Sequence, residues 1–114
     1  MLQIYGIKNC GSVKKALQFF DTHDIPYVFH DFKTAPVNEE KILSWLSKSN
    51  LSVLLNTKGT TYRTLNLKAL ALNDNEKIRW MGEHNLLIKR PVIEYGDQVI
   101  VGYEQSHYEG IFLS

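Results

Sequence analysis

The first 32 residues constrain the fold most, because their apolar pattern changes from that of a strand to that of a helix and back. Apolar and aromatic side chains dominate residues 1–5, and Gly6 ends the strand that they predict. From Gly11 the apolar residues recur at helical spacing, and residues 27–32 predict a second strand. Two strands flanking a helix within about 30 residues predict a βαβ unit with parallel strands and a right-handed crossover. The apolar face of the helix comprises Val13, Ala16, Leu17 and Phe20.

The middle of the chain carries helix signals. Asn38 can cap a helix, because two glutamates and then an apolar face follow it. Residues 50–72 mix leucines with a polar turn, and they predict short helical turns. Asn73 and Glu76 have the spacing of a capping box, which predicts a further helix ending near His84.

The last third of the chain predicts a hairpin and then a helix. Residues 86–95 are rich in strand formers, Gly96 and Asp97 form a two-residue turn, and residues 98–101 form the returning strand. Residues 104–112 predict the closing helix. The resulting order of β-α-β, helices and β-β-α is that of a thioredoxin-type core.

These elements predict an α/β fold with a thioredoxin/glutaredoxin-like core and an inserted helical segment. The core takes in about residues 1–33 and 86–114, and the insertion takes in about residues 37–85. We expect residues 1–114 to form a single domain, because this length is typical of one.

Composition excludes several classes of function. The formal net charge is only +1, which argues against a broad basic surface for nucleic acid or acidic membranes. No apolar run approaches the roughly 20 residues that span a bilayer, and no stretch has the pattern of a signal peptide. We therefore expect a cytoplasmic, monomeric protein without direct contacts to membrane or nucleic acid.

The chain has one cysteine, Cys10, so it cannot form an internal disulfide. A zinc site made of thiolates from this chain alone is also disfavoured, because such sites usually use two or more cysteines. A lone cysteine is commonly a small buried apolar residue, and that interpretation stands beside a reactive one. The histidines show no spacing typical of metal ligands, so we predict no metal. They are His23, His30, His84 and His107.

The position of Cys10 favours a reactive thiol. It lies between the first predicted strand and the first helix, where free N–H groups and the helix dipole favour a thiolate. We expect the N–H groups of Gly11 and Ser12 to support the charge of the sulfur, and Gly11 to allow close approach of a substrate. Lys8 adds positive charge, and so do the lysines at positions 14 and 15.

A second candidate feature is the pair Arg90 and Pro91. A bond before proline is the one that is readily cis, and in a thioredoxin-type core a cis-proline stands beside the cysteine. Arg90 would then stabilise the thiolate or hold an anionic group. The alternative is a solvated arginine before a proline that opens a strand, and the residues alone favour neither.

Four segments spread over the chain carry a resemblance. Together they resemble the ArsC family, which includes arsenate reductases, the transcriptional regulator Spx and the YffB-like proteins. The Gly-Ile-Lys-Asn-Cys and Leu-Leu-Asn-Thr-Lys-Gly-Thr-Thr-Tyr-Arg runs are most similar to the YffB-like branch. The segments are residues 2–10, 54–63, 88–91 and 101–103.

This resemblance implies that Cys10 is the nucleophile and that Arg90 is its main basic neighbour. It also implies glutathione or glutaredoxin as the reductant. Glutaredoxin-linked arsenate reductases use three arginines, and two of the matching positions are Ser52 and Gly102 here. Spx-type regulators generally carry Cys-x-x-Cys, whereas the second position here is Val13.

The function expected from these features is a glutathione-dependent thiol oxidoreductase that is not a true arsenate reductase. Glutathione is the expected co-substrate, and no bound cofactor is expected. Arg63 and Lys58 could bind a glutathione carboxylate, or they could be solvated charges in a polar turn. The alternative functions are an Spx-like protein that binds the RNA polymerase α subunit and a non-catalytic relic of the fold.

Overall fold

The computed structural model describes residues 1–113. The predicted βαβ unit is confirmed as β1 (Leu2–Gly6), α1 (Gly11–Thr22) and β2 (Tyr27–Asp31). Gly6 belongs to the strand that we expected it to end, because it pairs with Asp31. The later elements are α2 (Glu39–Leu46), α3 (Leu51–Leu54), α4 (Thr60–Thr64), η1 (Leu67–Leu70), α5 (Asp74–Glu83), η2 (Asn85–Leu87), β3 (Val92–Tyr95), β4 (Gln98–Val101) and α6 (Gln105–Phe112).

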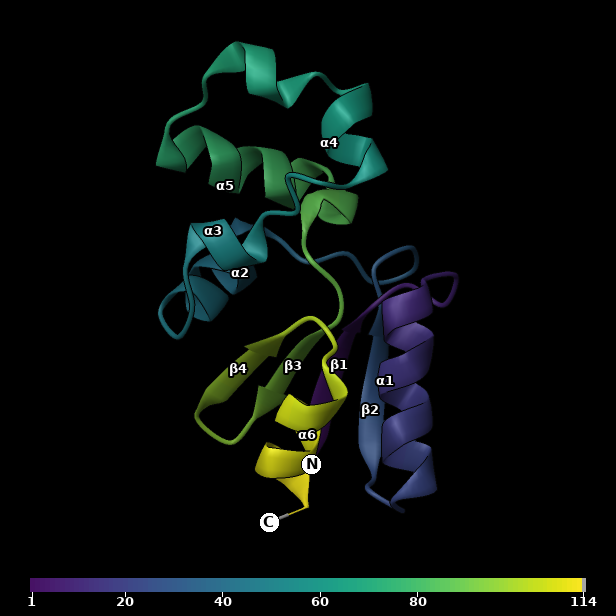
Figure 1. Ribbon diagram of the computed structural model, residues 1–114. Coiled ribbons are helices and arrows are strands. Elements are labelled where there is room, and N and C mark those ends of the chain that lie inside the picture. Colours follow the sequence, from purple (N-terminus) through teal and green to yellow (C-terminus); the bar gives the residue numbers. More distant parts are fainter. Residues whose placement is uncertain (114) are drawn as a thin grey trace.

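The four strands form one sheet in the order β2-β1-β3-β4. β1 and β2 are parallel, whereas β1 pairs with β3 and β3 pairs with β4 in antiparallel fashion. Because side chains alternate along a strand, Ile4 and Ile93 point to one face, and Tyr5 and Glu94 point to the other. Helices α1 and α6 cover the first face, and the helical insertion extends beyond one end of the sheet (Figure 1).

The core between the sheet, α1 and α6 is aromatic. Phe20 stacks on Tyr108 with ring centroids 5.7 Å apart, and Phe19 meets the same ring edge-on at 5.5 Å. The Tyr108 hydroxyl donates to the Gly102 carbonyl, and burial raises the pKa of Tyr108. Phe19 is buried, whereas Leu17 is only half-buried, so the buried face is rotated slightly from the predicted one.

The predicted helix caps of the insertion are confirmed. The Asn38 side chain accepts from the Lys41 N–H at 3.0 Å, which satisfies a free donor in the first turn of α2. Asn73 and Glu76 exchange hydrogen bonds of 2.9 and 3.0 Å in a capping box at the start of α5. Within residues 1–113, no helix is long and apolar enough to cross a membrane.

A single carboxylate attaches α2 to the sheet. Glu94 accepts hydrogen bonds from the Trp45 indole at 2.8 Å and from the Tyr5 hydroxyl at 3.2 Å. The Lys41 ammonium also lies 2.7 Å from the Glu94 carboxylate. Desolvation raises the pKa of Glu94, but hydrogen bonding from Lys41 and Trp45 outweighs it, so this pKa lies below its ordinary value.

The predicted strand at residues 86–95 is wrong in its first half, because β3 begins only at Val92. Residues Asn85–Leu87 form a short 3-10 helix instead, and Ile88 makes an isolated bridge with Leu55 of the insertion. Pro91 has no N–H with which to continue a ladder, so the strand starts after it.

We expect Glu94→Gln to lower the free energy of unfolding at pH 7 by about 1.5–3 kcal/mol, the range for hydrogen bonds to charged groups. A depressed pKa contributes stability above the unfolded-state pKa, and this contribution is lost as pH falls through the folded-state value. The difference in the free energy of unfolding between wild type and Glu94→Gln should therefore decrease below about pH 4. Urea titration followed by tryptophan fluorescence measures it, with the exposed Glu83→Gln as control. A gap that does not change with pH would contradict the ionic role of Glu94.

Candidate active site

Cys10 is the N-cap residue of α1. Its backbone is extended, with φ −143° and ψ 125°, and its carbonyl accepts the Lys14 N–H at 2.9 Å. A side chain at an N-cap faces the N–H groups two and three residues later, which here belong to Ser12 and Val13. The first turn contains no acidic residue, and the thiol is half-buried.

Arg90 is held rigidly beside this thiol. Its Nη1 donates to the Leu86 carbonyl at 2.8 Å and to the Ile88 carbonyl at 3.3 Å. Its buried Nε finds no acceptor within the described residues, so that edge of the guanidinium is not used by the fold. The Arg90–Pro91 peptide is cis, as expected, and the Pro91 carbonyl accepts the Gly102 N–H at 2.8 Å.

The pKa of the Cys10 thiol lies below that of an ordinary thiol. Desolvation by burial raises this pKa, but the Val13 N–H and the hydrogen bonding and charge of Arg90 outweigh it, with a smaller contribution from the Ser12 N–H. The N–H groups that act on the thiol thus come from the first turn of α1, with the Val13 N–H acting more strongly than that of Ser12. The role that we expected for the Gly11 N–H stays a prediction.

The remaining predicted residues lie around this centre. Lys8 is exposed two residues before Cys10, and the lysines at positions 14 and 15 are exposed on α1. A side chain at Gly11 would meet nothing within 4 Å, so the space beside the start of α1 is open to a ligand.

Arg63 contacts the loop before α4 and not the thiol. Its Nη1 donates to the Lys58 carbonyl at 2.8 Å, which braces the segment before α4. Arg63 also lines a cavity of about 230 Å³ with Tyr62 and Lys68. Among the described residues, Arg63 makes no contact with Cys10, so a role for Arg63 at the thiol stays a prediction.

The two positions that we expected to correspond to arginines of arsenate reductases hold no cation. The Ser52 hydroxyl donates to the Asn50 side chain at the start of α3. Gly102 has φ +85°, a conformation that favours glycine over residues with a side chain. Among residues 1–113, no three His, Cys, Asp or Glu side chains converge as metal ligands do.

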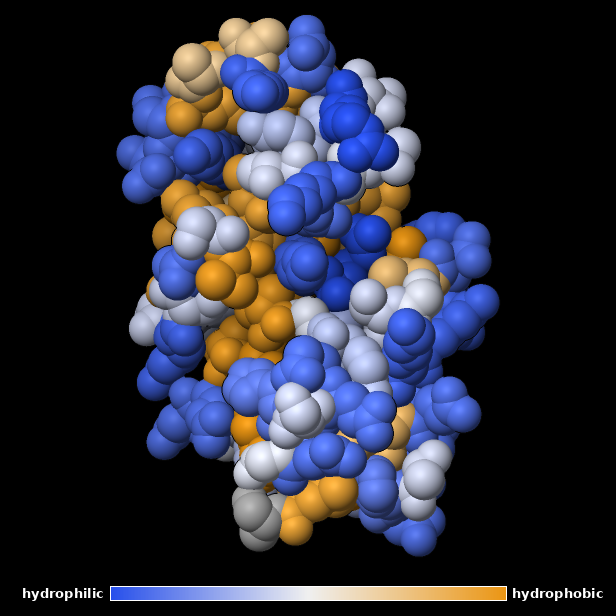
Figure 2. Space-filling view, viewed as in Figure 1, coloured by the Kyte–Doolittle hydropathy of each residue, from blue (hydrophilic) through white to orange (hydrophobic). Residues whose placement is uncertain are grey.

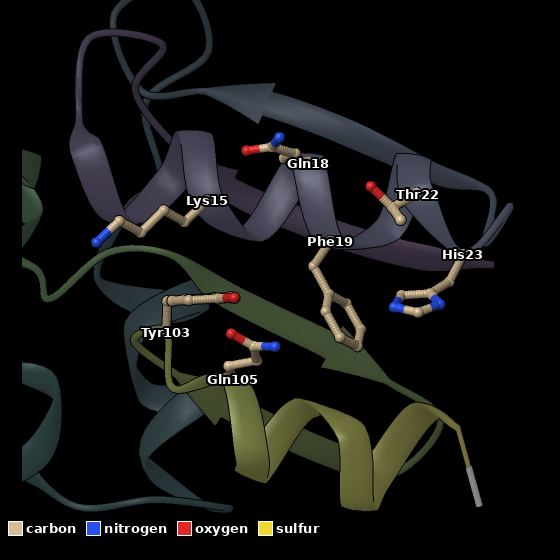
Figure 3. Close-up of a pocket in the computed structure, with 7 residues that line it drawn as sticks. All are labelled: Lys15, Gln18, Phe19, Thr22, His23, Tyr103 and Gln105. Carbon is tan, nitrogen blue, oxygen red and sulfur yellow. The ribbon is translucent and has the colours of Figure 1, made fainter.

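A larger cavity, of about 390 Å³, lies between α1 and the start of α6, and neither Cys10 nor Arg90 lines it. Figure 3 shows Phe19 and His23 along one wall, with Tyr103 and Gln105 opposite them. Lys15 reaches over the end of this cavity that is nearer the start of α1 (Figure 3). The cavity therefore follows the flank of α1, and the thiol site is a separate feature.

The fold and this site together define a class of protein. A thioredoxin/glutaredoxin-like core carries one cysteine at the start of its first helix, beside a cis-proline loop. A helical insertion separates β2 from β3. The chain belongs to the ArsC family, whose sequence pattern it matches over residues 5–111.

Known proteins similar to this chain cover it almost completely. An uncharacterized protein of Haemophilus influenzae is 30% identical over 98% of this chain and 99% of its own length. The global transcriptional regulator Spx of Lactiplantibacillus plantarum is 28% identical over 93% of this chain and 82% of its own.

Solved structures agree with this assignment. The structure of a YffB protein superposes with a TM-score of 0.90 at 33% identity, covering 96% of this chain and 97% of that one. A protein related to arsenate reductase from Brucella melitensis is 34% identical with a TM-score of 0.77, covering 97% and 93% of the two chains. The predicted resemblance to the ArsC family and its YffB-like members is thereby confirmed.

We expect the pH profile of iodoacetamide labelling to give Cys10 a pKa below the roughly 8.5 of a free thiol. Arg90→Ala should raise this pKa, because it removes the charge and the hydrogen bonding that lower it. Arg90→Lys should raise it less, since the charge is kept. Arg79→Ala, on the exposed side of α5, is the matched control and should change nothing. If the profile of Arg90→Ala overlays that of wild type, Arg90 does not act on the thiol.

Proposed function

We propose that this protein is a glutathione-dependent thiol oxidoreductase in which Cys10 is the only nucleophile. The observation that carries the proposal is the half-buried Cys10 thiol with a lowered pKa, facing the N–H groups of α1 and a fixed Arg90. A thiolate at neutral pH is both a good attacking group and a good leaving group. Those are the two properties that thiol–disulfide exchange needs.

The reaction has three exchanges. The Cys10 thiolate attacks one sulfur of a disulfide, so a bond to Cys10 forms as the substrate disulfide breaks. The departing sulfur leaves as a thiolate and takes a proton from solvent. A first thiolate of glutathione or glutaredoxin then attacks the Cys10 sulfur of this mixed disulfide and releases the second substrate sulfur as a thiol. A second external thiolate attacks the external sulfur now bound to Cys10, which releases the Cys10 thiolate and an oxidised external disulfide. Two electrons thereby pass from the two external thiols to the substrate, and no bound cofactor takes part.

An external thiol is required because Cys10 is the only cysteine in the chain. The position that would complete a Cys-x-x-Cys pair is Val13, which is fully buried in the core. Arg90 would orient an anionic group of the substrate through its positive charge beside the thiol. Lys8 and Pro91 would border the same thiol, and glutathione supplies two carboxylates as partners for the charges of Lys8 and Arg90.

The second candidate function is a regulatory protein that binds the RNA polymerase α subunit. The similarity to Spx regulators favours it. Exposed apolar side chains on the insertion offer a surface for a partner, with Leu43 on α2 54% exposed and Val53 on α3 44% exposed. Figure 2 shows apolar surface over this part of the molecule, beside α2, α3 and β4.

Incubation with oxidised glutathione should add one glutathione mass to wild type and none to Cys10→Ser, as read by intact mass spectrometry. Reduced glutathione or glutaredoxin should remove the adduct, because the chain has no second thiol that could resolve it. The proposal would be contradicted if a small neutral disulfide labels the wild-type protein but oxidised glutathione does not. Co-elution of that protein with the polymerase α subunit would then support the regulatory function.

We expect no arsenate-dependent oxidation of glutathione above the background of Cys10→Ser, even with glutaredoxin supplied. Charge-assisted contacts contribute about 1.5–3 kcal/mol each, so two absent arginines weaken oxyanion binding by about 100-fold or more. A coupled assay that follows glutathione oxidation at increasing arsenate concentrations measures this. Robust turnover by wild type would mean that other cations take the place of the absent arginines.

A further inference from the structure

Charge is strongly segregated along this chain, although its net charge is close to zero. Residues 1–20, 41–73 and 84–93 contain lysines and arginines but no aspartate or glutamate. These three segments carry the Cys10 loop, the helices α3 and α4, and the Arg90 loop. Among the cations of these segments, Lys41 alone forms an ion pair within the described residues, and its partner is Glu94. The other cations keep their charge available to a ligand.

Two of these unpaired lysines meet at one cavity. It has a volume of about 280 Å³, and Lys58 and Lys89 line it together with Ser52, Asn56 and Thr57. The cavity therefore combines two ammonium groups with hydroxyl and amide groups, and its lining contains no carboxylate. Such a set of donors suits a carboxylate ligand.

Backbone contacts hold this cavity together. The Lys89 N–H donates to the Leu54 carbonyl at 2.7 Å, and the Asn56 N–H donates to the Leu87 carbonyl at 2.8 Å. Leu55 and Ile88 form a bridge between these two contacts. Lys89 therefore projects from paired backbone, and the Lys58 N–H donates to the Asn56 side chain at 3.3 Å, which reduces the entropy lost when a ligand binds.

Lys89, which lines this cavity, connects it to the loop that acts on the thiol. Lys89 directly precedes Arg90, whose guanidinium acts on the Cys10 thiol. The Lys89 Cε lies 3.5 Å from the position that a Cβ at Gly102 would take, and the Gly102 N–H binds the Pro91 carbonyl. Glutathione carries its sulfur on the central residue, so each of its carboxylates lies about 7 Å away, or roughly two residue lengths. Lys89 is one residue from Arg90 along the chain.

We infer that Lys58 and Lys89 form a carboxylate subsite that holds one end of a glutathione molecule whose sulfur lies at Cys10. This inference rests on the proposed function for the identity of the thiol, but the subsite itself binds without any covalent step. Arg90 acts on the Cys10 sulfur through its charge and hydrogen bonding, and the two lysines select a ligand that carries a carboxylate. The substrate class is therefore a carboxylate-bearing thiol or its disulfide.

Binding can be measured apart from the chemistry in Cys10→Ser, by NMR titration with reduced glutathione. Adding Lys58→Gln and Lys89→Gln should weaken the affinity roughly tenfold, since exposed ion pairs contribute up to about 1 kcal/mol each. The diethyl ester of glutathione, which lacks both carboxylates, should bind Cys10→Ser more weakly than the acid does, and the extra substitutions should hardly affect it. Lys33→Gln with Lys77→Gln is the matched control, because it removes the same charge elsewhere on the surface.

The outcomes separate the subsite from the proposed function. Equal affinity for glutathione with and without the Lys58 and Lys89 substitutions overturns the subsite, even if wild type forms the mixed disulfide. Equal weakening of acid and ester also overturns it, because the lysines would then act without the carboxylates. Lysine-dependent binding in Cys10→Ser supports the subsite even if Cys10 of wild type fails to react, and only the proposed function then falls.

Discussion

The Glu94 carboxylate is the polar contact on which the arrangement of this molecule depends. It lies on the sheet face opposite α1 and α6, and it binds Lys41 and Trp45 of α2 and the hydroxyl of Tyr5. A half-buried carboxylate is costly unless its oxygens are satisfied, and these three donors satisfy them. Helix α2, and with it one side of the insertion, is thereby set at a defined position against the sheet.

The segment that joins the insertion back to the sheet is also held in a defined position. Hydrogen bonds with residues 54–56 hold residues 87–89, and the Arg90 side chain returns to the carbonyls of Leu86 and Ile88. An arginine fixed in this way needs little reorganisation when a thiolate or an anion appears beside it. The insertion therefore has a direct chemical consequence, because it positions both Arg90 and the neighbouring Lys89.

Local patterns predicted the elements well where one short stretch contains the whole signal. The caps at Asn38 and Asn73 and the change of period at Gly11 are examples, since capping and amphipathicity act within a few residues. The start of β3 was mispredicted because residues 86–88 are apolar for another reason. Leu87 and Ile88 are fully buried against the insertion, a long-range contact that strand propensity does not register.

The sequence by itself determined that one cysteine stands at a helix start, that no internal disulfide can form, and that lysines flank this position without acids. These properties follow from residue identity and from the geometry of a helix N-terminus. Only the tertiary structure decided which distant cations serve the site. Arg90 follows Cys10 by about eighty residues yet acts on its thiol, whereas Arg63 braces the Lys58 loop instead. Such selection depends on how the insertion packs, because a charge acts through distance in space and not through position in the chain.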